Sequence, residues 1–265
     1  MRTVALVVHD AKPRAVEVAE RFARLLEGLG INGVVTSEDA TLDEVEAVIG
    51  VGGDGTVLRA ARIALRRRIP IAGINVGRVG YLAEFELDEL ELLAEAIAAG
   101  RLRIIDRMTV EVTCGDVIVD AVNDVVIEKV LSQRVIEISV TISGHRFARY
   151  RTDGLIVATP AGSTAYSLSA GGPVVDPEVD ALVLTPVAPH SLLSRSLILA
   201  PDTVISVTVE IDRPARVNVD GREVCLVEPG QTIEVRRGAE RIRFLTLGGH
   251  PFPQAVRHQF GLDHA

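Results

Sequence analysis

The sequence has no tryptophan and few aromatic residues of any kind. Tyr and Phe make up 3% of the 265 residues, whereas hydrophobic residues as a whole make up 48%. The core must therefore be built mainly from Val, Leu, Ile and Ala, in a chain long enough for one large or two modest domains. No apolar run reaches the roughly 18 residues of a membrane-spanning helix. The N-terminus also lacks the cleavage site of a secretory signal, so we expect no membrane partner.

Cysteine and basic clusters are scarce as well. Cys114 and Cys225 are far apart, and the six histidines form no metal-ligand spacing with them. This pattern argues against a zinc site or a disulfide framework and favours the reducing cytoplasm. The net charge is −8, and the one basic run, residues 66–68, falls at the end of a predicted helix. A nucleic-acid partner is therefore not expected.

The first hundred residues alternate strand patterns with helix patterns. Apolar strand runs occupy residues 3–8, 34–36, 47–51 and 69–75, and helical spacing follows Pro13 and covers residues 57–65 and 87–99. Strands that alternate with helices predict an α/β domain over residues 1–100, with a parallel sheet covered by helices.

After Gly100 the pattern changes to short strands rich in Val, Ile and Thr. Turn residues separate these strands at Cys114-Gly115-Asp116, Asp220-Gly221 and Pro229-Gly230. We therefore predict a β-rich domain over residues 101–247. Residues 248–265 are not strand-like, and we expect this tail to return to the first domain.

A glycine-rich loop, Gly52-Gly53-Asp54-Gly55-Thr56, lies between a predicted strand and a predicted helix. Residues 50–55 satisfy G-x-G-x-x-G, but Asp54 would repel an uncompensated pyrophosphate. Asn75 also stands where a dinucleotide-binding fold expects an acid. There is no Walker-type sequence. A hydride-transfer fold is therefore disfavoured.

A phosphoryl-transfer site explains this loop better. Glycines let the backbone approach a ligand, and the start of the following helix attracts phosphate. Asp54 would accept a hydrogen bond from a nucleophilic hydroxyl or bind a metal carried by the phosphate donor, and Arg59 would offset ligand charge. The alternative is an ordinary glycine turn with Asp54 as a solvated helix cap.

Two further segments combine polar and small residues in apolar surroundings. Asn123 and Asp124 interrupt the apolar run 117–130, so they either form a hairpin tip or meet a ligand. Residues 150–173 are rich in Gly, Ala, Ser and Thr, which lets flat rings approach the backbone. In that segment Ser163 or Thr164 would cap the following helix. Close packing of small residues around a core tyrosine is the alternative.

Taken in order, these motifs resemble those of NAD kinases. The series comprises Gly52-Gly53-Asp54-Gly55-Thr56, residues 73–82, Asn123-Asp124, Thr152-Asp153-Gly154, Gly162-Ser163-Thr164-Ala165-Tyr166 and residues 185–190. Phosphofructokinases and diacylglycerol-type lipid kinases share the first motif but not the later series. The resemblance extends from about residue 48 to residue 221.

The resemblance implies a role for each matching residue. Asp54 would face the 2′-hydroxyl of the adenosine ribose of NAD, with Gly55 and Arg59 on the phosphate side. Asn123 and Asp124 would bind NAD. The other implied contacts are Tyr81, Arg134, Arg151, Asp153, Thr164, Ala165, Tyr166, Ser167, Leu168, Ser169, Ala188 and Arg222. Of these, Asp153 would lie near the nicotinamide, and Arg134 and Arg151 could act across a subunit boundary.

The same resemblance implies an NAD kinase-like two-domain architecture in a homodimer or homotetramer. NAD would be phosphorylated from ATP or inorganic polyphosphate. A divalent cation, Mg²⁺ or Mn²⁺, would be carried mainly by the donor phosphates rather than by protein ligands. Arg78 and Arg222 depart from the family pattern, in which His and Gln are common, and both add positive charge. His190 and His250 are interpreted as structural.

Three other functions remain compatible with parts of the sequence. The first is a lipid or small-molecule kinase of the same superfamily, which shares the glycine loop. The second is a non-catalytic dinucleotide sensor, which would have no use for Asp54. The third is an NAD(P)-dependent dehydrogenase, which the departures from the hydride-transfer fingerprint disfavour.

Overall fold

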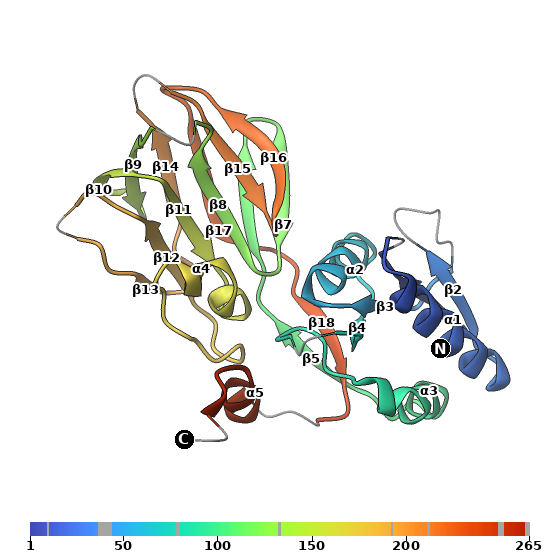
Figure 1. The fold of residues 1–265 in the computed structure, drawn as a ribbon. Helices are drawn as coiled ribbons and strands as arrows, with labels where there is room; N and C mark the ends of the chain where they lie inside the picture. Colours follow the sequence, from blue (N-terminus) through green and yellow to red (C-terminus); the bar gives the residue numbers. More distant parts are fainter. Residues whose placement is uncertain are drawn as a thin grey trace. The chain divides into compact units, whose positions relative to one another are not determined.

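The chain divides into two compact units (Figure 1). The computed structural model describes residues 1–9, 11–36, 44–77, 80–131, 134–191, 193–210, 213–248 and 252–262. Unit 1 comprises Met1–Arg107 and Ile242–Ala265, and unit 2 comprises Met108–Arg241. Unit 1 is α/β and unit 2 is β-rich, which confirms the predicted fold class. Residues 101–107 and 242–247, which the sequence boundaries assign to the second domain, lie in unit 1.

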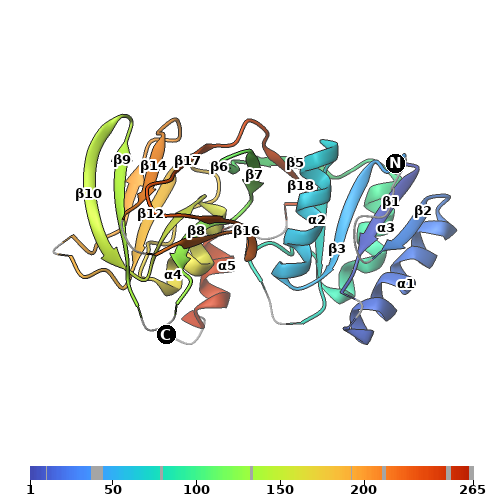
Figure 2. The ribbon, with the colours of Figure 1, turned by 90° about the horizontal axis from the view of Figure 1, so that it is seen from above.

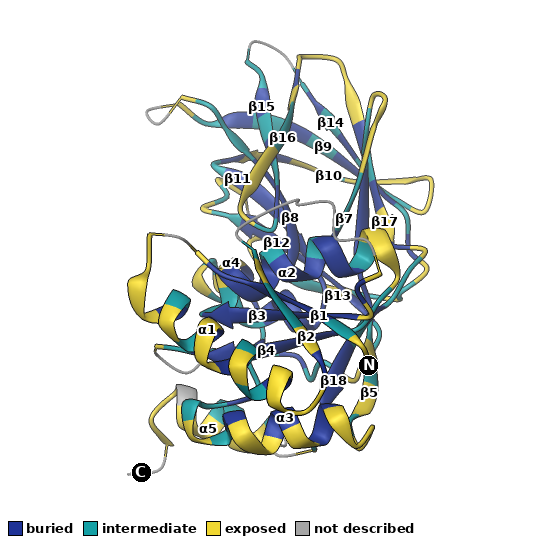
Figure 3. Ribbon diagram, turned by 90° about the vertical axis from the view of Figure 1, so that its right-hand side faces the viewer, coloured by how far each residue is buried: buried dark blue, intermediate teal, exposed yellow. Residues whose placement is uncertain are grey.

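Unit 1 contains a six-stranded sheet in the order β2-β1-β3-β4-β18-β5. The strands are β1 (Thr3–Val7), β2 (Asn32–Thr36), β3 (Ala47–Gly52), β4 (Ile71–Asn75), β5 (Arg103–Arg107) and β18 (Ile242–Thr246). All neighbours are parallel except β18 and β5, which pair antiparallel. Figure 3 shows β3 and β4 buried along their whole length, as expected for a parallel sheet covered on both faces.

Helices cover both faces of this sheet (Figure 2). The helices of unit 1 are α1 (Pro13–Gly28), α2 (Asp54–Arg67), α3 (Leu90–Ala98), which follows the short η1 (Leu87–Glu89), and α5 (Phe252–Gln259). The buried faces of α1 and α3 share one apolar cluster with the sheet, while α2 lies on the opposite face. A Cβ on Gly50 would meet the Val57 Cα of α2 at 2.8 Å, so this glycine lets α2 pack close to β3.

Unit 2 contains two six-stranded antiparallel sheets, ordered β10-β9-β14-β17-β6-β7 and β13-β12-β11-β8-β15-β16. The first has β6 (Val110–Cys114), β7 (Val117–Ala121), β9 (Ile136–Ile142), β10 (His145–Thr152), β14 (Ile205–Val209) and β17 (Thr232–Arg237). The second has β8 (Asp124–Lys129), β11 (Gly154–Ala158), β12 (Leu182–Val187), β13 (Leu197–Leu199), β15 (Ala215–Val219) and β16 (Arg222–Val227). One core cluster draws residues from both sheets, so the sheets pack as a sandwich. Between β11 and β12 lie η2 (Ala161–Thr164) and α4 (Tyr166–Ser169).

The core has the composition that the scarcity of aromatic residues predicts. Most of its buried side chains are Val, Leu, Ile and Ala, and Tyr150, Phe22 and Phe85 are the largest that are fully buried. Among the described helices, none combines the length and apolar character needed to cross a membrane.

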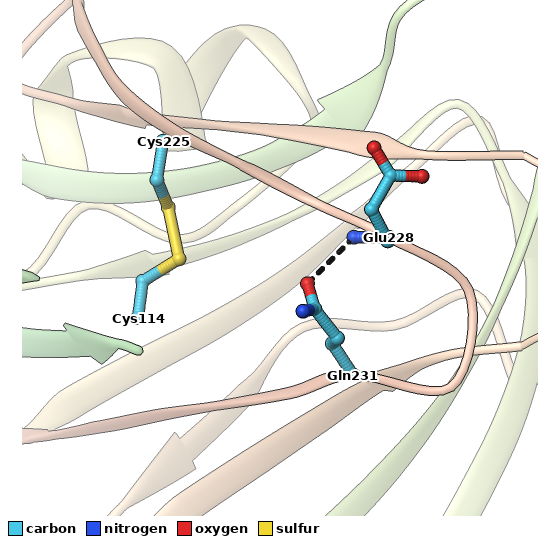
Figure 4. Close-up of a disulfide and its surroundings, with 4 residues drawn as sticks. All are labelled: Cys114, Cys225, Glu228 and Gln231. Carbon is cyan, nitrogen blue, oxygen red and sulfur yellow. Dashed lines mark hydrogen bonds between the residues drawn. A yellow bond between two sulfur atoms is a disulfide. The ribbon is translucent and has the colours of Figure 1, made fainter. Parts of the chain in front are cut away.

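The two cysteines are paired, contrary to the prediction from their spacing. Cys114 on β6 and Cys225 on β16 form a disulfide that links the two sheets of unit 2 (Figure 4). A sequence separation of 111 residues conceals this contact, because it arises only when the sandwich brings the two strands together. In the turn that follows β16, the Glu228 N–H donates to Gln231 Oε1 at 2.9 Å (Figure 4).

Candidate functional site

The predicted site residues fall into two sets, one in each unit. Unit 1 holds Asp54, Gly55, Arg59 and Tyr81. Unit 2 holds Asn123, Asp124, Arg134, Arg151, Asp153, Thr164, Ala165, Tyr166, Ser167, Leu168, Ser169, Ala188 and Arg222. Each set is described by itself below.

Asp54 is the first residue of α2, directly after the glycine turn. Its Oδ2 accepts the N–H of Tyr81 at 3.0 Å, and its Oδ1 accepts the N–H of Leu82 at 3.1 Å. The N-cap of α2 is Gly53, so Asp54 does not occupy the capping position. The carboxylate is therefore held by a second loop, and the alternative of a solvated helix cap does not describe it. A carboxylate offers about four acceptor sites, so two remain for a ligand.

The loop that holds Asp54 is itself fixed by a buried amide. Asn75, 1% exposed at the end of β4, donates from Nδ2 to both carboxylate oxygens of Glu86, at 3.0 and 3.2 Å. Its Oδ1 accepts the N–H of Gly77 at 3.0 Å. From the sequence, Asn75 was identified as standing in place of an expected acid and as part of the motif 73–82, whereas Glu86 was not identified. Asn75 could have been singled out as a polar residue at the end of a predicted buried strand.

The remaining predicted residues of unit 1 are Tyr81, Arg59 and Gly55. The Tyr81 hydroxyl is buried and has no hydrogen-bond partner among the described residues. Burial raises the pKa of Tyr81, and the nearby charge of Asp54 raises it further. Arg59 donates from Nη1 to the Val8 carbonyl at 3.3 Å, and Gly55 is exposed. Arg78 and His250 lie outside the described residues.

In unit 2, Asn123 and Asp124 lie where the chain passes from one sheet to the other. They follow β7, which pairs with β6, and lead into β8, which pairs with β11 and β15. The hairpin-tip alternative is therefore wrong, because β7 and β8 belong to different sheets. Both residues are buried, with exposed fractions of 8% and 4%.

The backbone around these two residues is held closely. Thr159 donates from Oγ1 to the Val122 carbonyl at 2.6 Å and from its N–H to the Asn123 carbonyl at 2.8 Å. A Cβ on Gly162 would overlap the Asn123 backbone, so only glycine fits there. The Asn123 Oδ1 is buried and has no hydrogen-bond partner among the described residues. An unsatisfied buried acceptor of this kind indicates a place for a ligand donor or a water.

The Asp124 carboxyl group has an unusual acidity. Its pKa is raised to about 7, first by burial and then by the negative charge of Asp220, while the backbone N–H of Tyr166 opposes the rise. The group therefore changes charge near neutral pH. Strongly perturbed groups of this kind concentrate at functional sites.

The segment from Ala161 to Ser169 differs from the capping prediction. Neither Ser163 nor Thr164 caps α4, which begins after Ala165 without a side-chain cap. Instead Ser163 Oγ accepts the N–H of Val175 at 3.0 Å. Ser167 is fully buried, and its Oγ is 3.0 Å from Thr185 Oγ1. Tyr166 is 42% exposed rather than a core tyrosine.

Two other predicted residues of unit 2, Asp153 and Arg151, form ion pairs. Asp153 accepts an ion-paired hydrogen bond from Lys129 Nζ at 2.6 Å, and Arg151 lies 3.5 Å from Glu137. Burial raises the pKa of Tyr166, and the charges of Glu128, Asp153 and Asp124 raise it further, whereas Lys129 lowers it. The exposed residues are Arg134, Arg151, Ser169, Ala188 and Arg222, while Thr164, Ala165 and Leu168 are half-buried.

Within the described ranges, no group of three or more His, Cys, Asp or Glu residues could hold a metal ion.

The chain has an α/β unit and a β-rich unit, and family profiles identify this class of two-domain protein as kinases that act on a nucleotide. The profile described as ATP-NAD kinase N-terminal domain matches residues 35–102, and that described as ATP-NAD kinase C-terminal domain matches residues 122–247.

Individual relatives define the family. NAD kinase 2 of Streptomyces avermitilis is 38% identical, with 100% of this chain and 96% of the relative covered. NAD kinase of Heliobacterium modesticaldum is 37% identical, with 98% of each covered. The chain belongs to the NAD kinase family, whose reaction is the phosphorylation of NAD to NADP.

Solved structures agree with this assignment. An NAD kinase from Archaeoglobus fulgidus, crystallised in complex with ATP, has a TM-score of 0.81 and 28% identity, with 97% of each chain covered. Yeast NADH kinase complexed with NADH has a TM-score of 0.90 and 23% identity, with 100% of this chain and 89% of that chain covered. The second likeness concerns the fold alone.

Proposed function

We propose that this enzyme transfers the γ-phosphoryl group of ATP to the 2′-hydroxyl of the adenosine ribose of NAD, with Asp54 orienting that hydroxyl. The observation that carries the proposal is the anchoring of Asp54 by the N–H groups of Tyr81 and Leu82. This anchoring fixes the carboxylate at the start of α2, where backbone N–H groups favour phosphate. The ATP complex of the Archaeoglobus fulgidus relative supports ATP as donor. Inorganic polyphosphate is the second donor to be tested.

Positioning supplies most of the catalysis in this scheme. Phosphoryl transfer passes through a loose transition state that needs alignment and charge neutralisation more than a strong base. Asp54 accepts the hydroxyl hydrogen, aligns the oxygen with the phosphorus atom, and takes the proton late. Gly55 and Arg59 belong to the phosphate side. A divalent cation, Mg²⁺ or Mn²⁺, is bound mainly by the donor phosphates.

The residues of unit 2 bind the dinucleotide. Asp124 accepts hydrogen bonds from ribose hydroxyls, and Asn123 offers its unpartnered Oδ1 to a ligand N–H or O–H group. The segment Thr164, Ala165, Tyr166, Ser167, Leu168 and Ser169 lines the nucleotide, with Tyr166 stacking on a ring. The remaining contacts come from Asp153, Ala188, Arg134, Arg151 and Arg222 of unit 2 and from Tyr81 of unit 1. By resemblance to its family, the enzyme works in the cytoplasm as a homodimer or homotetramer.

Replacing Asp54 tests the central assignment. Asp54→Asn removes the charge and puts an amide N–H₂ where two backbone N–H groups require acceptors, so we expect kcat to fall about 10²–10⁴-fold. The KM for NAD should stay within about threefold, because Asp54 contacts only the reacting hydroxyl and the other proposed NAD contacts are on other residues. Asp88→Asn, an exposed acidic position in η1, is the matched control. Near-normal turnover by Asp54→Asn would show that the assignment is wrong.

A donor and acceptor screen separates the remaining functions. Purified protein is incubated with Mg²⁺ and NAD, and with ATP or polyphosphate in turn, and NADP is measured. Diacylglycerol or a sugar phosphate as preferred acceptor would indicate the lipid or small-molecule kinase. Absorbance of reduced nicotinamide formed without a phosphate donor would indicate a dehydrogenase. NAD binding without any turnover would indicate a sensor.

A further inference from the structure

Asp220 lies in the tight turn between β15 and β16. Asp220 and Gly221 have φ values of 48° and 76°, and Val219 pairs with Arg222 across the turn. Two consecutive residues with positive φ define a type I′ hairpin, which Asp-Gly favours. The sequence therefore explains the turn, but the turn alone does not explain why the carboxylate points back to another loop.

The Asp220 carboxylate accepts three consecutive backbone N–H groups. Its Oδ2 accepts the N–H of Val122 at 2.9 Å. Its Oδ1 accepts the N–H groups of Asn123 and Asp124, at 2.8 and 3.2 Å. In return the Asp220 N–H donates to the Asp124 carbonyl at 3.1 Å. Four hydrogen bonds thus join the turn to the segment that carries the proposed NAD-binding pair.

We propose that Asp220 is a positioning residue for NAD binding, which holds residues 122–124 so that Asn123 and Asp124 present their side chains to NAD. This inference rests on the proposed function, in which Asn123 and Asp124 bind NAD. A carboxylate is an acceptor on both oxygens, so it satisfies all three donors. An amide or hydroxyl in its place leaves at least one buried N–H without an acceptor, which loosens the segment.

The charge of Asp220 has a second effect. It disfavours ionisation of Asp124, whose pKa is raised by burial and then by Asp220. Because protonated Asp124 loses acceptor capacity for ribose hydroxyls, the KM for NAD should rise as pH falls through about 7. Removing the Asp220 charge lowers the pKa of Asp124, so this rise should move to lower pH.

The other charged groups around Asp124 come from several elements. From α4, Tyr166 contributes its N–H and a phenol. The neighbouring β11 and η2 have no titratable residues in their sequences, GLIVA and AGST. Between β15 and β16, Arg216 forms an ion pair with Glu223 at 2.9 Å. Arg222, also on β16, is exposed. On β8, the charged residues after Asp124 are Glu128 and Lys129. Asp220 is the negative charge that acts on Asp124 directly.

Kinetics of Asp220→Asn test the proposal, because asparagine keeps the positive-φ turn. At pH 8 we expect the KM for NAD to rise about tenfold, with kcat and the KM for ATP within about threefold of the parent enzyme. The pH at which the KM for NAD begins to rise should fall by about one pH unit. Asp116→Asn, which makes the same change at the exposed β6–β7 turn, should alter neither quantity.

Three results separate the possible failures. An unchanged KM for NAD in Asp124→Asn overturns the NAD-binding role that the proposed function gives to Asp124. A raised KM in Asp124→Asn with a parental KM and pH profile in Asp220→Asn overturns only the positioning role. A raised KM in Asp220→Asn at an unchanged pH midpoint also overturns it, because removal of the Asp220 charge should lower the pKa of Asp124.

A measurement on the unaltered enzyme covers the case in which Asp220→Asn does not fold. Amide hydrogen exchange followed by NMR, without NAD, should show Val122, Asn123 and Asp124 protected at least tenfold relative to free peptide. Exchange of all three amides at the free-peptide rate would overturn the proposal.

Discussion

At the level of single residues, close approach by neighbouring atoms shapes both sets of candidate residues, the one in unit 1 and the one in unit 2. A Cβ on Gly80 would overlap the Asp54 carboxylate, and a Cβ on Gly162 would overlap the Asn123 backbone. Neither glycine has a positive φ. Each is needed because another residue's oxygen occupies the space of a side chain.

Gly80→Ala should therefore impair catalysis by displacing Asp54. The added methyl group forces the carboxylate or the loop to move, which lengthens the bonds from Tyr81 and Leu82. Small misplacements of a catalytic group cost up to about 10²-fold in rate, so we expect kcat to fall between about 10- and 100-fold. Steady-state kinetics with NAD and ATP measure the change.

Gly77→Ala is the matched control in the same loop. A Cβ there meets no atom within 4 Å, and the N–H that donates to Asn75 Oδ1 is retained. We expect kcat within about twofold of the parent enzyme. Equal losses of activity in the two variants would show that the loop, rather than the contact with Asp54, is responsible.

Single residues also show which parts of the candidate site can be predicted from the sequence. The glycine turn identified Asp54, and an interruption of an apolar run identified Asn123 and Asp124, because both signals are local. Asp220 and Thr159, which form hydrogen bonds with residues 122–124, were not identified, because no local sequence pattern marks them. Asp220 bonds to residues 96 to 98 positions away, and its Asp-Gly context is fully explained by a turn.

Among the secondary structure elements, local patterns predicted the strands and helices of unit 1 well. Amphipathic helices and buried parallel strands have their own periodicities. Strand pairing is not local, which is why the Asn123-Asp124 segment resembled a hairpin tip although β7 and β8 lie in different sheets. For the same reason, residues 242–247 resembled one more strand of the β-rich domain.

The β6–β7 hairpin contains an unfavourable pair. Asp120 on β7 lies directly opposite Glu111 on β6, and like charges in this position repel. Glu111 is compensated by Arg236 at 2.8 Å, whereas the Asp120 Oδ1 is buried without a hydrogen-bond partner among the described residues. Burial, then Glu111 and Glu240, raise the pKa of Asp120 to about 6.

Asp120→Asn should therefore stabilise the protein at alkaline pH. A carboxyl group whose pKa is raised on folding costs stability above its folded pKa, and this cost disappears as pH falls toward the unfolded value. We expect a gain of roughly 1–2 kcal/mol in the free energy of unfolding at pH 8, discounted for partial solvent exposure. The gain should decrease from about pH 6 and vanish near pH 4.

Urea unfolding followed by far-ultraviolet circular dichroism measures this difference, since the chain has no tryptophan to report it. Asp116→Asn, on the same hairpin but exposed, should change stability by less than about 0.5 kcal/mol at either pH. A gain in Asp120→Asn that is equal at pH 4 and pH 8 would contradict the electrostatic explanation.

At the level of the whole chain, unit 2 is a single continuous insertion into unit 1. Arg107 and Ile242, which flank it, are direct partners in the antiparallel pairing of β5 with β18. The insertion therefore begins and ends at neighbouring points, as a hairpin loop does. Both partners of the Cys114–Cys225 disulfide also lie within it.

Residues 108–241 should fold when expressed alone. The segment has the typical size of an independent domain, about 100–150 residues, and it contains all twelve strands of the two sheets. The core cluster of the sandwich draws every member from it. We expect a cooperative thermal transition, dispersed amide NMR signals and a fall in melting temperature on reduction of the disulfide. NAD phosphorylation should be absent, because Asp54 is missing.

A second fragment provides the contrast, namely residues 122–247, the range matched by the C-terminal family profile. This fragment lacks β6 and β7, which complete one sheet, and retains only one of the two cysteines. It adds β18, whose pairing partners β4 and β5 are absent. Removing two strands exposes part of the sandwich core and leaves β17 as an unpaired edge prone to association. We therefore expect aggregation or a non-cooperative melt. If this fragment folded as well as residues 108–241, stable folding of the unit would not require all six strands of that sheet.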